Sequence, residues 1–286
     1  MKKIAVTLDG SELSHSALAW AKLLCEPETE VHLIRAFREP QEYFYNNLEP
    51  VPSDQVKTEK VVEKIRKYLE AQARTLDQPT KMHAGCGEPA ETILYQAKRR
   101  EVDLIVMASH GRGGMDRWLL GSVATKVVRG SEIPVLVIRP EEDDSPPAVD
   151  RILVPLDGSE TSEAALGKAV GLARFLQAEL ILYLGLSFPR TGFPSAVQQY
   201  VESGVKEGEK YLDQQAEKCQ GVKVTTVVKD TTPGHGIVEN ADKLQVDMIV
   251  MGSHGRSGVS RWILGSVTEN VVQSSKLPVL VVHHHK

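Results

Sequence analysis

Short apolar runs alternate with longer, more polar segments along the whole chain. The runs that predict strands are residues 3–8, 30–37, 79–86, 102–109 and 133–139, and then 151–156, 178–185, 222–228, 246–253 and 277–283. Between them, apolar residues three and four apart, such as Ala17, Leu18, Ala21 and Leu24, predict amphipathic helices, with long polar helices over about 53–76 and 195–219. The fourth run of each set is apolar enough for burial on both faces, which is typical of parallel strands. This alternation predicts an α/β fold.

The second half of the chain repeats the first. Residues 102–137 align without gaps to residues 246–281, and 23 of the 36 positions are identical. The segment KIAVTLDGSELSHSAL, which starts at Lys3, recurs as RILVPLDGSETSEAAL at Arg151. Between the copies, an acidic run and paired prolines suit an exposed linker. We therefore predict domains over residues 1–140 and 150–286, joined by a linker over 141–149, each a doubly wound five-stranded parallel sheet.

Composition narrows the range of partners. The 286 residues carry a formal net charge of −4 and only 5% aromatic residues, so neither charge nor base stacking favours nucleic acid. No apolar run reaches the length of a membrane span, and MKKIAVTLDG turns polar too early for a secretory signal. Cys25, Cys86 and Cys219 are far apart and form no CxxC pair. We expect a cytoplasmic protein that binds neither nucleic acid nor membrane.

A glycine-rich segment follows the fourth predicted strand of each copy. In the second copy its spacing is Gly252-x2-Gly255-x9-Gly265-Ser266, and the last pair opens a predicted helix. The first NH groups of a helix have no intrahelical partner, so this helix start is suited to phosphate. Arg256 and Arg261 add positive charge there, as Arg112 and Arg117 do in the first copy. In a doubly wound sheet, this segment and the Asp-Gly-Ser turn after the first strand meet in one crevice if strands one and four are neighbours.

These residues carry a family resemblance. The pattern GSHG-x9-GS, the V-x-L-D-G-S turn after the first strand and the final P-V-L-V-V strand are similar to those of the universal stress protein family. The likeness extends over essentially the whole chain as two tandem domains, and the glycine spacing resembles that of the ATP-binding subgroup. The resemblance implies a Rossmann-like five-stranded sheet in the order 3-2-1-4-5.

The resemblance also implies which residues bind ATP. The aspartate after the first strand would lie near the phosphates and their Mg or Mn ion, the glycines and the helix start would hold the triphosphate, and the end of the second strand would meet adenine. In the first copy these positions are Asp9, Ala36, Ala108, Gly111, Gly121, Ser122 and Val123; in the second they are Asp157, Gly185, Gly252, Gly255, Gly265, Ser266, Val267 and Thr268. Ala108 departs from the pattern, because the ATP-binding subgroup has glycine there.

Each signal also has a simpler structural interpretation. The glycine segments could be sharp connecting loops, and Asp9 and Asp157 could cap the helices that follow them, although Ser11 and Ser159 are better placed for capping. His110 and His254 suggest catalysis, but no motif surrounds a nucleophile, and we predict no catalytic residue. In the first copy, the methyl group of Ala108 stands where the ATP-binding subgroup has glycine, which should weaken ATP binding. In the second copy, Thr268 adds a hydroxyl group for phosphate. We therefore expect the second copy to be the stronger ATP site.

Three functions remain open. The first is an ATP-binding regulator of a stress response, with slow hydrolysis or autophosphorylation at most. The second is an ATP-cleaving enzyme of the adenine-nucleotide α-hydrolase group, whose SGGxDS-type phosphate loop is replaced here by DGSELS and DGSETS. The third is a nucleotide-free scaffold. For all three, the long apolar fifth strands predict that the two halves pair within the chain, with a homodimer as a further possibility.

Overall fold

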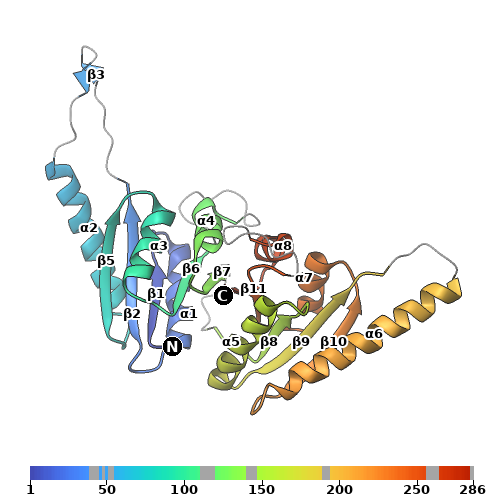
Figure 1. The fold of residues 1–286 in the computed structure, drawn as a ribbon. Coiled ribbons are helices and arrows are strands. Elements are labelled where there is room, and N and C mark those ends of the chain that lie inside the picture. The colour runs from blue at the N-terminus through green and yellow to red at the C-terminus, as the bar shows by residue number, and fades with distance from the viewer. Residues whose placement is uncertain are drawn as a thin grey trace. The chain divides into compact units, whose positions relative to one another are not determined.

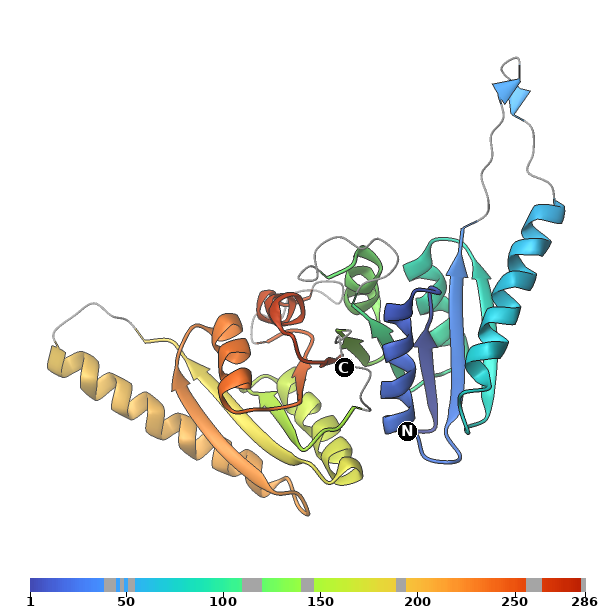
Figure 2. The same ribbon diagram turned by 180° about the vertical axis from the view of Figure 1, so that it is seen from behind.

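A computed structural model describes residues 1–38, 45–46, 49–50, 55–109, 120–139, 147–188, 194–255 and 264–283. These residues form two compact units (Figures 1 and 2). The first unit holds the elements up to α4, and the second holds β7 and everything from β8 onward. In the described part of the chain, no helix has the length and hydropathy that a membrane span requires.

The first unit is built around four parallel strands in the order β5-β2-β1-β6. Its elements are β1 (Lys3–Thr7), η1 (Glu12–His15), α1 (Ser16–Leu24), β2 (Glu30–Phe37), β3 (Tyr45–Asn46), β4 (Glu49–Pro50), α2 (Gln55–Ala73), β5 (Thr80–Cys86), α3 (Pro89–Arg99), β6 (Leu104–Ala108) and α4 (Ser122–Gly130). Helices cover both faces of the sheet, and strands β1 and β6 are almost wholly buried. The two-residue strands β3 and β4 pair with each other and were not predicted.

The second unit has the predicted strand order. Its elements are β7 (Val135–Ile138), β8 (Arg151–Pro155), α5 (Glu160–Leu176), β9 (Glu179–Leu186), α6 (Pro194–Glu217), β10 (Val224–Asp230), α7 (Pro233–Lys243), β11 (Met248–Gly252), α8 (Ser266–Ser274) and β12 (Val279–Val282). The parallel strands run β10-β9-β8-β11-β12, which is the order 3-2-1-4-5. Strands β8 and β11, the first and fourth, are therefore neighbours, as a crevice at their carboxyl ends requires.

The same pair of hydrogen bonds to an aspartate holds the start of the first strand in both units. Asp103 Oδ2 accepts hydrogen bonds from the backbone N of Lys2 (2.7 Å) and Lys3 (3.0 Å). In the second unit, Asp247 Oδ2 accepts from the backbone N of Asp150 and Arg151, both at 2.8 Å. The repeat seen in the sequence is thus a repeat of individual hydrogen bonds, and it sets strand one against strand four in each sheet.

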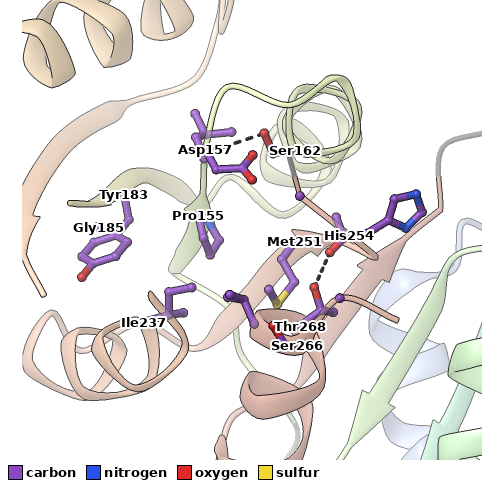
Figure 3. A pocket seen from close by; sticks show the side chains of 15 residues that line it. Pro155, Asp157, Ser162, Tyr183, Gly185, Ile237, Met251, His254, Ser266 and Thr268 are labelled. Carbon is purple, nitrogen blue, oxygen red and sulfur yellow. Dashed lines mark hydrogen bonds between the residues drawn. The ribbon is translucent and has the colours of Figure 1, made fainter. Parts of the chain in front are cut away.

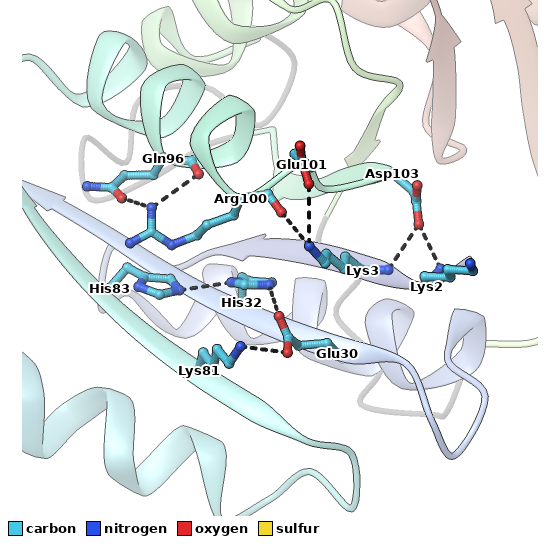
Figure 4. A network of polar contacts seen from close by, with 10 residues as sticks. All are labelled: Lys2, Lys3, Glu30, His32, Lys81, His83, Gln96, Arg100, Glu101 and Asp103. Atoms are coloured by element: carbon cyan, nitrogen blue, oxygen red, sulfur yellow. Dashed lines mark hydrogen bonds and ion pairs between the residues drawn. The ribbon is translucent and has the colours of Figure 1, made fainter.

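A polar cluster around the buried His32 distinguishes the first unit (Figure 4). His32 Nδ1 lies 2.9 Å from His83 Nε2, and His32 Nε2 lies 2.7 Å from Glu30 Oε1. Lys81 Nζ pairs with the other oxygen of Glu30 at 2.7 Å. His32 is only 2% exposed. At the same register the second unit has the apolar residues Ile181 and Val227, so the histidines replace a hydrophobic pair.

The fifth strand of the parallel set, β12, pairs on its other side with β7, which comes from the first copy of the repeat. The pairing is antiparallel, with Val279, Leu280 and Val281 opposite residues 137, 136 and 135. Both strands are buried along their whole length. An apolar strand edge needs such a cover, since an exposed one pairs with other chains.

We expect separately produced halves to associate for this reason. A fragment of residues 147–286 lacks β7, so it should self-associate at the free edge of β12, and added fragment 1–140 should convert it to a 1:1 complex. Sedimentation at increasing concentration measures both states. Halves that stay monomeric alone and in mixture would contradict this expectation.

Candidate nucleotide site

The turn after the first strand of the second unit places an aspartate. Asp157 Oδ1 accepts hydrogen bonds from Ser159 N (3.0 Å) and Ser159 Oγ (2.6 Å). Gly158 has φ of +81°, which favours glycine. Ser159 is the N-cap of α5, accepting from Ser162 N at 3.2 Å. The serine therefore caps the helix, and the aspartate is held by the capping serine instead of capping the helix itself.

The first unit repeats this turn closely. Asp9 Oδ1 accepts from Ser11 N (2.9 Å) and Ser11 Oγ (2.6 Å), and Gly10 has φ of +84°. Ser11 is the N-cap of η1. Both aspartates are thus fixed through one oxygen by the same local geometry.

The other oxygen of Asp157 lies against the glycine-rich segment. A β-carbon built on Gly255 would lie only 2.2 Å from Asp157 Oδ2, so any other residue at position 255 would require the aspartate side chain to move. The residues that follow the first and fourth strands therefore approach each other closely at the carboxyl end of the sheet. This convergence is what the sequence analysis expected of the crevice.

The start of α8 forms a second wall of the same crevice. Gly265 is the N-cap, with extended backbone (φ −61°, ψ 142°) and no side-chain cap. Its own N–H donates to Ser253 O at 2.8 Å, which ties the helix start to the end of β11. In the first unit Gly121 N donates to Ser109 O at 2.7 Å, and α4 starts at Ser122 without a side-chain cap. The first NH groups of both helices are therefore available to an anion.

One pocket joins these features in the second unit (Figure 3). Asp157, His254, Gly255, Gly265 and Ser266 line its polar part. Its apolar part is lined by Pro155, Tyr183, Gly185, Ile237 and Met251. Such an arrangement can hold a ligand with an anionic group at one end and a flat, weakly polar group at the other.

The pocket brings together most of the residues predicted for the second copy. These are Asp157, Gly185, Gly252, Gly255, Gly265, Ser266, Val267 and Thr268. In the first copy, Asp9 follows β1, Ala36 lies near the end of β2, Ala108 ends β6, and Gly121, Ser122 and Val123 open α4. Gly111, Arg112 and Arg256 lie outside the described residues, as does His110.

Two of the predicted ligand-binding residues, Gly252 and Thr268, also have structural contacts. A β-carbon on Gly252 would meet Thr161, at 2.9 Å from Cγ2 and 3.0 Å from the backbone carbonyl, so this glycine lets β11 pack against α5. The Thr268 hydroxyl, predicted to serve phosphate, donates to Gly252 O at 2.8 Å, and Thr268 is only 3% exposed. Both residues therefore have structural roles at the back of the pocket.

The apolar end of the pocket, with Tyr183, Ile237 and Met251, was not predicted from the sequence. One signal was available, because Tyr183 lies two residues before Gly185 in a strand and so faces the same side of the sheet. His254 was considered for catalysis; its Nδ1 lies 2.8 Å from Ser253 Oγ, its neighbour in sequence.

Comparison with known proteins places the chain in a family. The model of the universal stress protein family matches residues 1–139 and again residues 148–283. A universal stress protein of Mycobacterium tuberculosis H37Rv is 36% identical over 188 residues, which is 63% of this chain. The match spans 62% of that relative's length. A second universal stress protein of the same strain is 27% identical over 294 residues, 97% of this chain and 95% of the relative.

A solved structure shows the same fold over the whole length. The crystal structure of a universal stress protein from Archaeoglobus fulgidus superposes with a TM-score of 0.69, covering 99% of this chain and 97% of that one at 20% identity. The repeated turns, the repeated helix starts and the two family matches agree: the chain is a tandem member of the universal stress protein family.

Proposed function

We propose that the second unit binds ATP together with Mg or Mn, and that the chain acts as a nucleotide-dependent regulator in a stress response. The observation that carries the proposal is the approach of Asp157 Oδ2 to Gly255, next to the uncapped start of α8. The helix start attracts phosphate, and the apolar end of the pocket offers a surface for a base.

A divalent cation follows from the charges of this site. A carboxylate beside a triphosphate is repulsive unless a cation lies between them, and Mg and Mn prefer carboxylate and phosphate oxygens. Asp157 would hold the ion through the side that faces Gly255, since Ser159 holds the other oxygen. The same set of Asp9, Gly121 and Ser122 supports a second, weaker site in the first unit.

Replacing Asp157 with asparagine tests the role of the cation. Asparagine keeps an oxygen for Ser159, so the turn should persist, but it removes the charge that would hold the ion. We expect the gain in ATP affinity caused by Mg to shrink by about tenfold or more. Calorimetric titration with ATP, with and without Mg, measures this gain.

Asp9→Asn is the matched control, because it removes the same carboxylate from the first unit and should leave the stronger site unchanged. A protein whose Mg-dependent ATP binding is unaltered by Asp157→Asn would contradict the placement of the cation. A freshly purified chain that releases no nucleotide on denaturation and binds no ATP would instead favour the scaffold function.

The rate of ATP turnover distinguishes a regulatory function from an enzymatic one. With labelled ATP we expect slow conversion at most: among the described residues, His254 contacts the hydroxyl of Ser253, which is only 2% exposed and does not line the pocket. Rapid multiple turnover to AMP and pyrophosphate would support the α-hydrolase function and overturn the proposed one.

A further inference from the structure

A buried tyrosine stands at the apolar end of the pocket. Tyr183, in β9, is 1% exposed and lines the cavity (Figure 3). Asn240 Nδ2 donates to the Tyr183 hydroxyl oxygen at 3.3 Å and to Gly236 O at 2.8 Å. The bond to a carbonyl fixes the amide orientation, because a carbonyl accepts only from the nitrogen. The tyrosine oxygen is thus an acceptor toward α7.

In this arrangement, Asn240 provides no acceptor for the hydroxyl proton of Tyr183. A phenol has one donor, and Asn240 cannot receive it through the nitrogen that donates. Among the residues that the structure describes, Asn240 is the partner of this hydroxyl. Burial raises the pKa of Tyr183 to about 12, so the proton stays in place at any physiological pH. A buried donor without an acceptor is costly, and the pocket is where an acceptor can arrive.

The hydroxyl lies close to the backbone that the family resemblance assigns to adenine. A β-carbon on Gly185 would lie 3.5 Å from Tyr183 Cε1 and 3.7 Å from its hydroxyl oxygen. One planar ligand edge can therefore contact both the strand backbone at Gly185 and the hydroxyl of Tyr183. Ile237 and Met251 line the same part of the pocket with apolar surface, against which a base can pack.

We infer that Tyr183 is a specificity-determining residue of this site, whose hydroxyl donates a hydrogen bond to an unprotonated ring nitrogen of the adenine base. The inference rests on the proposed ATP binding and names how the base is recognised. Asn240 is the positioning residue, because its bond to Gly236 O orients the amide that holds the tyrosine oxygen.

The first unit has no tyrosine at the equivalent position of its second strand. The register of β2 places Ile34 where β9 has Tyr183, and an isoleucine has no hydrogen to donate. Recognition of a ring nitrogen by this hydroxyl is therefore confined to the second unit. This difference is a second reason, beside the methyl group of Ala108, to expect unequal sites.

Titration of the full chain with ATP and with its 1-deaza, 3-deaza and 7-deaza analogues tests the inference. Each analogue replaces one ring nitrogen by C–H. Removing one neutral hydrogen bond typically weakens binding by about three- to tenfold. We expect Tyr183→Phe to lose that factor for ATP. We also expect one analogue to bind the unaltered protein about as weakly, with no further loss in Tyr183→Phe.

Tyr200→Phe is the matched control, because Tyr200 is 63% exposed on α6 and its hydroxyl should not matter. Equal ATP affinity of Tyr183→Phe and the unaltered chain would overturn the inference, as would equal losses for all three analogues. If Tyr183→Phe does not fold, the analogue series on the unaltered chain decides alone: full affinity for all three analogues overturns the inference. An unaltered chain that binds no ATP fails the proposed function itself, and the inference falls with it.

Discussion

Replacing Gly265 with aspartate is expected to abolish ATP binding by the second unit while the fold persists. Gly265 is the N-cap of α8 in extended backbone, the conformation in which aspartate is a favoured cap. The new carboxylate would accept from the NH groups of Val267 or Thr268 and so occupy the donors that a phosphate needs. It would also repel the phosphate. We expect a loss of about a hundredfold or more, on the order of 3 kcal/mol.

Two further variants separate the effect of the added charge on ATP affinity from the steric effect of the added side chain. A β-carbon at position 265 would lie 3.1 Å from His254 Cα, so even alanine must displace its neighbour slightly. Gly265→Ala should therefore show the steric part of the loss alone, and Gly121→Asp should leave the second unit intact. Calorimetry with ATP and Mg gives the affinities, and thermal unfolding without ligand reports the fold. A folded Gly265→Asp variant with undiminished affinity would mean that α8 does not face the phosphates.

Most of the fold could be predicted because a strongly apolar run suits few positions in an α/β fold; run 133–139 is the exception, since it forms β7, which groups with the second unit and pairs antiparallel with β12. A run such as 246–253, buried on both faces, forms β11, a central parallel strand flanked by β8 and β12. The long helices followed from spacing, with α6 observed over Pro194–Glu217 where about 195–219 was expected. Strands β3 and β4 escaped prediction, since two-residue strands have no periodicity to detect.

The site was predictable only where local sequence determines geometry. The Asp-Gly-Ser turn and the Gly-Ser helix start contain their own hydrogen-bonding partners, so Asp157 and Gly265 could be placed from their neighbours. For a glycine, by contrast, the sequence does not show which neighbouring atom requires the side chain to be absent. Gly252 was expected to face a ligand, but the direction of its missing side chain depends on how α5 packs. Tyr183 was missed for a related reason, because a buried strand residue can face either the core or a cavity.

The largest effect away from the pocket is expected from the histidine cluster of the first unit, as a dependence of stability on pH. Burial lowers the pKa of His83 to about 4 and also lowers the pKa of His32. The cations Arg100 and Lys81 act in the same direction, whereas Glu30 opposes them. The unfolded chain, with histidine pKa values near about 6.5, binds more protons than the folded one between these values. Stability should therefore fall as pH drops below about 6.5, and the part of this fall that comes from His83 should be complete near pH 4.

The geometry of the histidine pair also predicts that stability falls as pH falls. The contact of 2.9 Å between His32 Nδ1 and His83 Nε2 requires one nitrogen to donate and the other to accept. A second proton would place two donors face to face in a buried site. We expect the free energy of unfolding of the first unit to decrease by on the order of 3 kcal/mol over this window, measured by denaturant unfolding at a series of pH values.

The second unit supplies the variant that tests this expectation. Because Ile181 and Val227 occupy the same register there, the double variant His32→Ile with His83→Val should fold and lose most of the pH dependence. Glu30 keeps Lys81 as its partner in this variant, so its own titration persists at lower pH, where protonation breaks the pair. His235→Gln, at an exposed position of the second unit, is the control and should change nothing. If the double variant loses stability between pH 6.5 and 4 as steeply as the unaltered chain, the histidine pair is not the source of the acid sensitivity.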